Sequence, residues 1–134
     1  MVPKTIEAVL FDAVGTLIHS RNSVGKIYRN IALKYGSDIP AEKLQEGFLR
    51  ETTSHGTPVN QEGWKTLLHA VFLQHGPFLQ FEEFFAEVYA FFQSGHSWKC
   101  YPETESVLTY LAKKHYRMAI VSNFDQRLFG ILSD

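Results

Sequence analysis

Two short apolar runs, one near each end of the chain, predict buried strands. Ile6–Phe11 has the sequence IEAVLF and stops at Asp12, whereas Arg117–Val121 has the sequence RMAIV and stops at Ser122. Neither run alternates cleanly between apolar and polar positions, which is typical of strands covered on both faces in a parallel sheet. We therefore expect two parallel strands with both faces buried.

The residues between these runs have the spacing of helices, with apolar positions three and four residues apart. Ser23 is a suitable N-cap and Gly36 a suitable end for the first helix, and Pro40 suits the first position of the second. Thr52–Asn60 is rich in turn residues and predicts a loop. A third helix is expected to stop at Gly76-Pro77, a fourth near Ser94-Gly95, a fifth to start at Pro102, and a last one to span Gln126–Leu132.

Aromatic side chains gather in the fourth expected helix, between Phe81 and Phe92. Their helical spacing indicates a core, although the same residues could form a partner-binding surface. The order of elements is strand, four helices, one more helix, strand and short helix. It predicts an α/β fold with helices inserted after its first strand. A chain of 134 residues has room for one domain or for part of a larger one.

Composition narrows the choice of partner and compartment. Thirteen basic and 14 acidic residues leave a net charge of -1, so we expect neither nucleic acid nor an anionic membrane as a partner. The single cysteine, Cys100, excludes an internal disulfide and fits a reducing compartment. No run of 18 apolar residues is present, and Ile6–Phe11 is too short for a signal core. We expect a cytoplasmic protein, of unpredicted oligomeric state.

Asp12 is the first candidate for chemistry, because it follows the first expected strand directly. Ligands of open α/β sheets bind at the carboxyl ends of the strands. The turn Ala13–Thr16 is small and flexible enough to bring backbone N–H groups close to an anion. A carboxylate at that place can act as a nucleophile or a metal ligand, or it can simply cap the turn.

Two motifs resemble those of the haloacid dehalogenase-like hydrolases. Residues 9–17 (VLFDAVGTL) look like the first motif of this family, and residues 119–125 (AIVSNFD) look like the second, a strand that ends in Ser or Thr. The helices between them match the cap that the family inserts at this point. The resemblance implies a partial Rossmann-like core, residues 1–17 and 97–134, that carries a four-helix cap at residues 18–96.

The family's chemistry maps onto individual residues. The resemblance implies that Asp12 is the nucleophile that attacks a phosphoryl group and that Ser122 donates a hydrogen bond to a phosphate oxygen. It implies a Mg²⁺ ion held by the Asp12 carboxylate and the backbone carbonyl of Val14. The implied phosphate-binding residues are Gly15, Thr16, Ser122 and Asn123. The expected substrate is a small phosphorylated metabolite of unpredicted identity.

Val14 departs from the family's phosphatase motif. That motif places a second Asp at this position, which protonates the leaving alcohol, and valine cannot do so. Dehalogenases of the family also lack this second Asp, so displacement of a halide is the enzymatic alternative. Those enzymes use an arginine of the cap, and neither Arg29 nor Arg50 matches it by spacing.

The family's later motifs supply a lysine and acidic metal ligands, and they follow the second motif by more residues than this sequence holds. We therefore expect a truncated form, with the C-terminal half of the core missing, that is inactive alone. A non-catalytic chain that binds a partner through the aromatic residues of its cap is the alternative from a different functional class.

Overall fold

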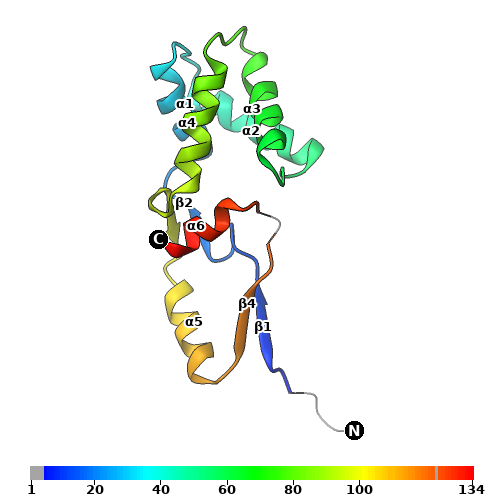
Figure 1. The fold of residues 1–134 in the computed structure, drawn as a ribbon, viewed down its shortest axis with the longest axis vertical. Helices are drawn as coiled ribbons and strands as arrows, with labels where there is room; N and C mark the ends of the chain where they lie inside the picture. Colours follow the sequence, from blue (N-terminus) through cyan, green and yellow to red (C-terminus); the bar gives the residue numbers. More distant parts are fainter. Residues whose placement is uncertain (1–4, 123) are drawn as a thin grey trace.

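Four helices form one end of the molecule, and two parallel strands with one helix form the other (Figure 1). The computed structural model describes residues 5–122 and 124–134. The helical end comprises α1 (Val24–Lys34), α2 (Ala41–His55), α3 (Gln61–Leu73) and α4 (Phe81–Gln93). The sheet end comprises β1 (Ala8–Phe11), β4 (Arg117–Ile120) and α5 (Thr104–Lys113). The prediction of an α/β fold with four helices inserted after its first strand is confirmed.

The helical end is packed around large apolar side chains. Its largest fully buried side chains are Tyr28, Leu44, Leu68, Val71, Phe72 and Phe84. The predicted core of α4 is confirmed, since Phe81, Phe84, Phe85 and Phe92 are buried and only Phe91 of its phenylalanines is exposed. Little of this aromatic stripe is therefore left on the surface to bind a partner.

A side-chain cap sets the start of α1, and a close contact at Gly25 sets how α1 packs on α2. The Ser23 hydroxyl accepts a hydrogen bond from the Lys26 N–H at 3.3 Å, as the sequence predicted for the start of α1. Gly25 lies against the start of α2, where an added Cβ would come within 2.2 Å of the Ala41 carbonyl oxygen. A side chain at this position would push α1 and α2 apart, so the contact between the two helices depends on glycine.

The predicted loop at Thr52–Asn60 is wrong in its first part, because α2 continues to His55. The Thr52 hydroxyl donates to the Phe48 carbonyl at 2.9 Å, one helical turn earlier. Threonine is a turn residue in composition, but this bond lets it stay within a helix. The helix ends at Gly56, whose φ of +79° lies in the left-handed region.

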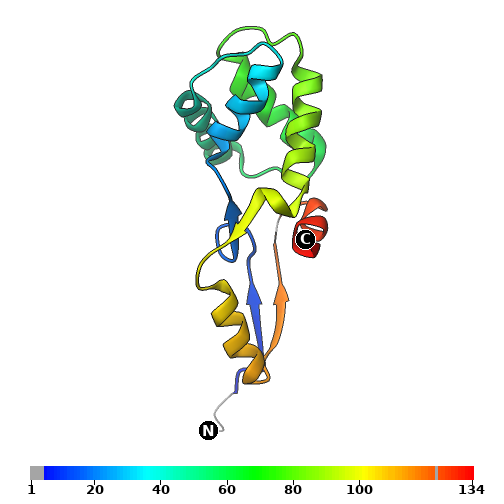
Figure 2. The ribbon, with the colours of Figure 1, turned by 90° about the vertical axis from the view of Figure 1, so that its left-hand side faces the viewer.

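The two predicted strands pair in parallel, with Ala8 opposite Arg117 and Phe11 opposite Ile120. The expectation that both faces are buried is wrong: every residue of β4 is exposed, and Leu10 of β1 is 65% exposed. Among the described residues each strand has one neighbouring strand, and α5 is the helix at this end of the molecule (Figure 2). Two strands and one helix give too little cover to bury the apolar side chains.

A second pair of strands was missed. β2 (Ile18–Ser20) runs antiparallel to β3 (Trp98–Cys100), which a short 3-10 helix, η1 (Gly95–Ser97), precedes. Three-residue strands are too short to show a period in the sequence, so the expectation of helix throughout this segment is corrected here. β2 precedes the four helices and β3 follows them, so the pair connects the segments that lead into and out of the helical end. The Tyr101 N–H, which donates to the Leu17 carbonyl at 3.1 Å, adds a further hydrogen bond between these segments.

The last two helices are close to their predicted places. α5 begins at Thr104, two residues after the expected Pro102, and the Thr104 hydroxyl donates to the Leu17 carbonyl at 2.8 Å. α6 (Arg127–Ser133) is offset by one residue from its prediction. It lies between the helical and sheet ends (Figure 1).

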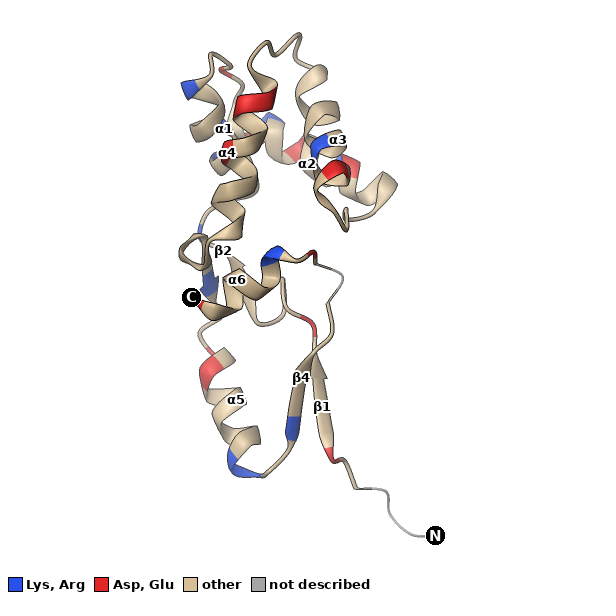
Figure 3. Ribbon diagram, in the orientation of Figure 1, with Lys and Arg blue, Asp and Glu red and all other residues tan. Residues whose placement is uncertain are grey.

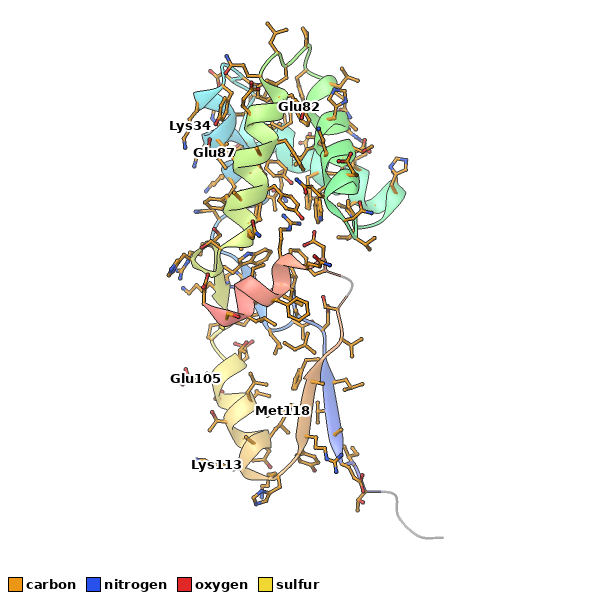
Figure 4. The ribbon with its side chains drawn as sticks, viewed as in Figure 1. Lys34, Glu82, Glu87, Glu105, Lys113 and Met118 are labelled. Carbon is orange, nitrogen blue, oxygen red and sulfur yellow. The ribbon has the colours of Figure 1, made fainter. Side chains whose placement is uncertain are left out.

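Acidic and basic residues are interspersed along both ends of the molecule (Figure 3). Lys34 of α1 and Glu87 of α4 form an ion pair on the outside of the helical end (Figure 4), and the Tyr35 hydroxyl donates to the same carboxylate at 2.6 Å. The hydrogen bond from Lys34, and to a smaller extent the one from Tyr35, holds the pKa of the Glu87 carboxyl below its usual range. None of the helices in the described ranges has the length and apolar character needed to cross a membrane.

Candidate active site

Asp12 and Ser122 follow the carboxyl ends of two neighbouring strands. Phe11 pairs with Ile120 at the end of the parallel ladder, and the Val121 N–H donates to the Phe11 carbonyl at 2.8 Å. The next residues of both strands therefore leave the sheet at the same edge. Asp12 is exposed and Ser122 is half-buried, and both line one cavity. The structure thus brings together the two residues that the motifs placed at the strand ends.

The loop after Asp12 is closed by its own hydrogen bonds. The Gly15 N–H donates to the Ile18 carbonyl at 2.8 Å, and the Thr16 N–H donates to the Ala13 carbonyl at 3.1 Å. Gly15 has a φ of +86°, so the turn needs glycine there. The Thr16 hydroxyl donates to Asp12 Oδ2 at 3.5 Å. The Gly15 and Thr16 amides thus close the loop, and the Thr16 hydroxyl faces the carboxylate.

Ser122 keeps a donor available. Its Oγ accepts a hydrogen bond from the Phe124 N–H at 3.1 Å, which orients the hydroxyl. The hydroxyl hydrogen donates to none of residues 5–122 and 124–134, so within that part of the chain it can still donate to a ligand. Asn123, the other candidate from this loop, lies outside the described residues.

The cavity lies between the two ends of the molecule and has a volume of about 330 Å³. Asp12, Val14, Gly15 and Ser122 line it from the sheet side. Five lining aromatic side chains form a continuous series, four from α1–α4 and one from β3, which we call the aromatic wall: Trp64, Phe48, Tyr28, Phe92 and Trp98. Successive rings of the wall are 5.9–6.5 Å apart between centroids, and Phe48 stacks almost parallel to Trp64.

A comparison with known families decides the identity. The family model described as "Hydrolase: haloacid dehalogenase-like hydrolase" matches residues 6–130, nearly the whole chain.

The chain belongs to the haloacid dehalogenase-like hydrolases.

Curated relatives agree with this family. Haloacid dehalogenase-like hydrolase domain-containing protein 3 of Homo sapiens is 26% identical over 141 residues, covering 95% of this chain and 55% of the relative. The Mus musculus protein of the same name is 29% identical over 135 residues, covering 92% and 54%. The chain therefore spans about half the length of the curated relatives it matches.

A solved structure has the same fold. The chain described as "Crystal Structure analysis of a Dehalogenase" matches with a TM-score of 0.65 at 19% identity, covering 98% of this chain and 58% of that one. At this identity the match supports the arrangement of strands and helices and says nothing about substrate.

Arg127 of α6 lies at the junction between the sheet side and the helical end of the chain. Its guanidinium forms a two-pronged ion pair with Asp125, with Nη2 2.8 Å from Oδ2, and both side chains are 5% exposed. The guanidinium carbon also lies 4.0 Å from the ring centroid of Tyr89 on α4. No local sequence pattern signals the contact of Arg127 with a helix almost forty residues earlier.

The cap arginine of the family's dehalogenases has no counterpart in Arg29 or Arg50. Arg29 pairs with Asp38 and Arg50 donates to Gln74, and neither lines the cavity. His19 does line it, with Nδ1 2.9 Å from the Ser20 carbonyl oxygen and its ring 4.7 Å from that of Tyr101. Among residues 5–122 and 124–134, no group of three or more His, Cys, Asp or Glu side chains lies together.

Proposed function

We propose that this hydrolase cleaves small phosphorylated metabolites with Asp12 as its nucleophile. The observation that carries the proposal is the position of Asp12 and Ser122 at the carboxyl ends of paired strands, in one cavity. A carboxylate oxygen of Asp12 attacks phosphorus, and the bond between phosphorus and the leaving group breaks. Water then attacks phosphorus, releasing inorganic phosphate and restoring the carboxylate. This route replaces one difficult displacement by two easier ones.

Neighbouring residues support these steps. The Ser122 hydroxyl donates to a phosphate oxygen, where negative charge grows in the transition state. The Thr16 hydroxyl restrains the Asp12 carboxylate from the opposite side of the loop. We propose that residues 18–96 act as the cap of this site, since their helices supply the aromatic wall.

The donors at the loop fit a Mg²⁺ ion. Mg²⁺ is bound in proteins through one or two carboxylates together with substrate phosphate and water. Here the Asp12 carboxylate and the Val14 carbonyl are oxygen donors two residues apart on an exposed turn. When bound, the ion would neutralise charge on the phosphoryl oxygens.

Val14 limits the reaction to certain leaving groups. Its side chain lines the cavity beside Asp12 and cannot protonate a departing alcohol. We therefore expect this chain to hydrolyse alkyl phosphates slowly or not at all. A leaving group that is already a weak base needs no such help.

Halide displacement is the second candidate, and it is favoured by the apolar Val14 and by the aromatic wall. In that reaction Asp12 attacks the carbon that carries the halogen, and the halide leaves. Water then attacks the carboxyl carbon of the resulting ester. A single turnover in ¹⁸O-labelled water distinguishes the two: label enters Asp12 in halide displacement and the released phosphate in phosphate hydrolysis.

Turnover of 4-nitrophenyl phosphate with and without Mg²⁺ tests the proposal. In a form of the protein that also carries the family's later lysine and acidic motifs, we expect Mg²⁺-dependent release that Asp12→Asn abolishes, whereas Glu105→Gln, on α5 and outside the cavity, leaves it unchanged. The 134-residue chain alone should release little or none. Release of halide without metal would favour the second candidate. The absence of either activity, in a folded and stably oligomeric protein, would contradict both and favour a partner-binding role.

A further inference from the structure

The aromatic wall is the feature that the proposed reaction leaves unused. Asp12 and Ser122 occupy one side of the cavity, so a substrate with its phosphoryl group at Asp12 directs its leaving group across the cavity toward the wall. Each of α1, α2, α3 and α4 contributes a ring, and β3 contributes Trp98. The whole helical end therefore shapes the place where the leaving group lies.

The wall carries no charge. Burial raises the pKa of Tyr28, so its phenol stays neutral at physiological pH. The lining residues contributed by the helical end include no Lys, Arg, Asp or Glu in the described part of the chain. Arg127 is a lining cation, but the Asp125 carboxylate neutralises it and Tyr89 covers it. A charged leaving group would lose hydration here without meeting a free opposite charge. The wall does offer one hydrogen-bond donor, the buried Trp64 Nε1–H, which donates to none of the described residues.

Two features of the cavity, the aromatic wall and Val14, favour the same kind of leaving group. The wall favours a flat apolar leaving group, because rings pack edge to face or offset against other rings. Val14 favours a leaving group that is a weak base, because its side chain lines the cavity with Asp12 and has no proton to donate. A phenol satisfies both conditions, since it is aromatic, uncharged and more acidic than an alkyl alcohol.

We propose that the substrates of this site are phosphate monoesters of phenols, with the aryl group against the aromatic wall formed by Trp64, Phe48, Tyr28, Phe92 and Trp98. This inference rests on the proposed function and specifies its substrate class. The cavity of about 330 Å³ is at the lower end of the volumes usual for small-molecule sites, which suits a leaving group of one or two rings.

Binding of stable phosphonates tests the class without requiring turnover. Benzylphosphonate, methylphosphonate and 2-hydroxyethylphosphonate carry the same head group and differ in the attached body. Both tryptophans of the chain line the cavity, so their fluorescence reports occupancy directly. For the 134-residue chain with Mg²⁺ we expect benzylphosphonate to bind at least tenfold more tightly than either other phosphonate, and benzyl alcohol to bind far more weakly.

A matched pair of variants tests whether the aryl group lies against the aromatic wall. Phe48 is half-buried and belongs to the wall, whereas Phe91 is exposed and does not line the cavity. Phe48→Leu should reduce the preference for benzylphosphonate at least threefold, and Phe91→Leu should leave it unchanged. If Phe48→Leu does not fold, as judged by circular dichroism, the comparison of phosphonates on the unmodified chain decides the matter.

Equal binding of the three phosphonates overturns the substrate class, as does failure of all three to bind. Binding of benzyl alcohol as tight as that of benzylphosphonate overturns it too, because the phosphate would then contribute nothing. Turnover of 4-nitrophenyl phosphate by Asp12→Asn overturns the proposed function instead. The two failures therefore produce different results.

Discussion

The helical end and the sheet end differ in how they bury apolar side chains. In the helical end, Phe84 is 0% exposed, and the rings of Phe72, Phe78 and Phe81 lie 4.7–5.9 Å from its ring between centroids. At the sheet end, Leu10 is 65% exposed and all of β4 is exposed. The aromatic wall thus belongs to a packed core, whereas the nucleophile follows a lightly covered strand.

This difference separates recognition from chemistry. The part that would select the leaving group is held by many apolar contacts and can be rigid without help from the sheet end. Asp12 depends on the register of β1 with β4 and on the hydrogen bonds of its own loop. Substitutions should therefore act on stability at one end and on reaction rate at the other.

The largest predicted effect is loss of stability in the helical end. Phe84→Ala should lower the free energy of unfolding by about 3–5 kcal/mol, because it leaves a cavity in a packed core. Leu10→Ala at the sheet end should change it by no more than about 0.5 kcal/mol, since that side chain is largely exposed. Urea unfolding of both variants measures the contrast, and equal losses would contradict the comparison.

The contact between the two ends gives the next effect. Arg127→Met should cost about 3 kcal/mol, because it leaves the buried Asp125 carboxylate without its partner. The double variant Arg127→Met/Asp125→Leu should recover most of this loss, because no buried charge remains. A double variant as unstable as the single one would show that the contact of Arg127 with Tyr89 matters more than the ion pair.

At the sheet end the effect should appear in rate. Val14→Asp supplies an acid beside Asp12 and should raise Mg²⁺-dependent hydrolysis of an alkyl phosphate by about 10²–10⁴-fold. Val14→Asn, of the same shape but without an acidic proton, should not. Unfolding in urea should be little changed, because Val14 is 36% exposed. A loss of stability without a gain in rate would contradict the separation of roles.

The smallest predicted effect is on the pH dependence of stability, through Glu87 on the outside of the helical end. Because the pKa of Glu87 is lowered in the folded protein, its contribution to stability is present above the ordinary glutamate pKa. That contribution is lost as the pH falls through the lowered value. Glu87→Gln should therefore be slightly less stable at neutral pH and show a flatter acid dependence. Urea unfolding midpoints of the unmodified chain and of Glu87→Gln, measured between pH 7 and pH 3, test this expectation. Identical midpoints at every pH would contradict a contribution of Glu87 to the acid dependence of stability.

Local sequence signals were sufficient for the helices and for the two residues at the strand ends. Ser23 and Gly36 mark the limits of α1, and Asp12 and Ser122 follow apolar runs that pair as expected. The strands at Ile18–Ser20 and Trp98–Cys100 were missed, because three residues carry no readable period and pair over a long separation.

The residues that the four helices contribute to the cavity could not be predicted. Phe48 and Trp64 look like ordinary core residues of α2 and α3, and only the packing of the helices makes them line a cavity with Asp12. The exposure of Leu10 was missed for a similar reason. Apolar runs indicate which residues favour burial, but the number of neighbouring strands and helices decides how far they are buried.

The most direct test of the account is to trap the covalent intermediate on Asp12. A form of the protein that also carries the family's later motifs would be quenched with acid during turnover of 4-nitrophenyl phosphate with Mg²⁺, reduced with borohydride, and analysed by peptide mass spectrometry. Reduction converts an aspartyl phosphate to homoserine, and the account predicts this change at residue 12 alone. Unmodified Asp12 in a sample that releases nitrophenol, or modification at another residue, would contradict it.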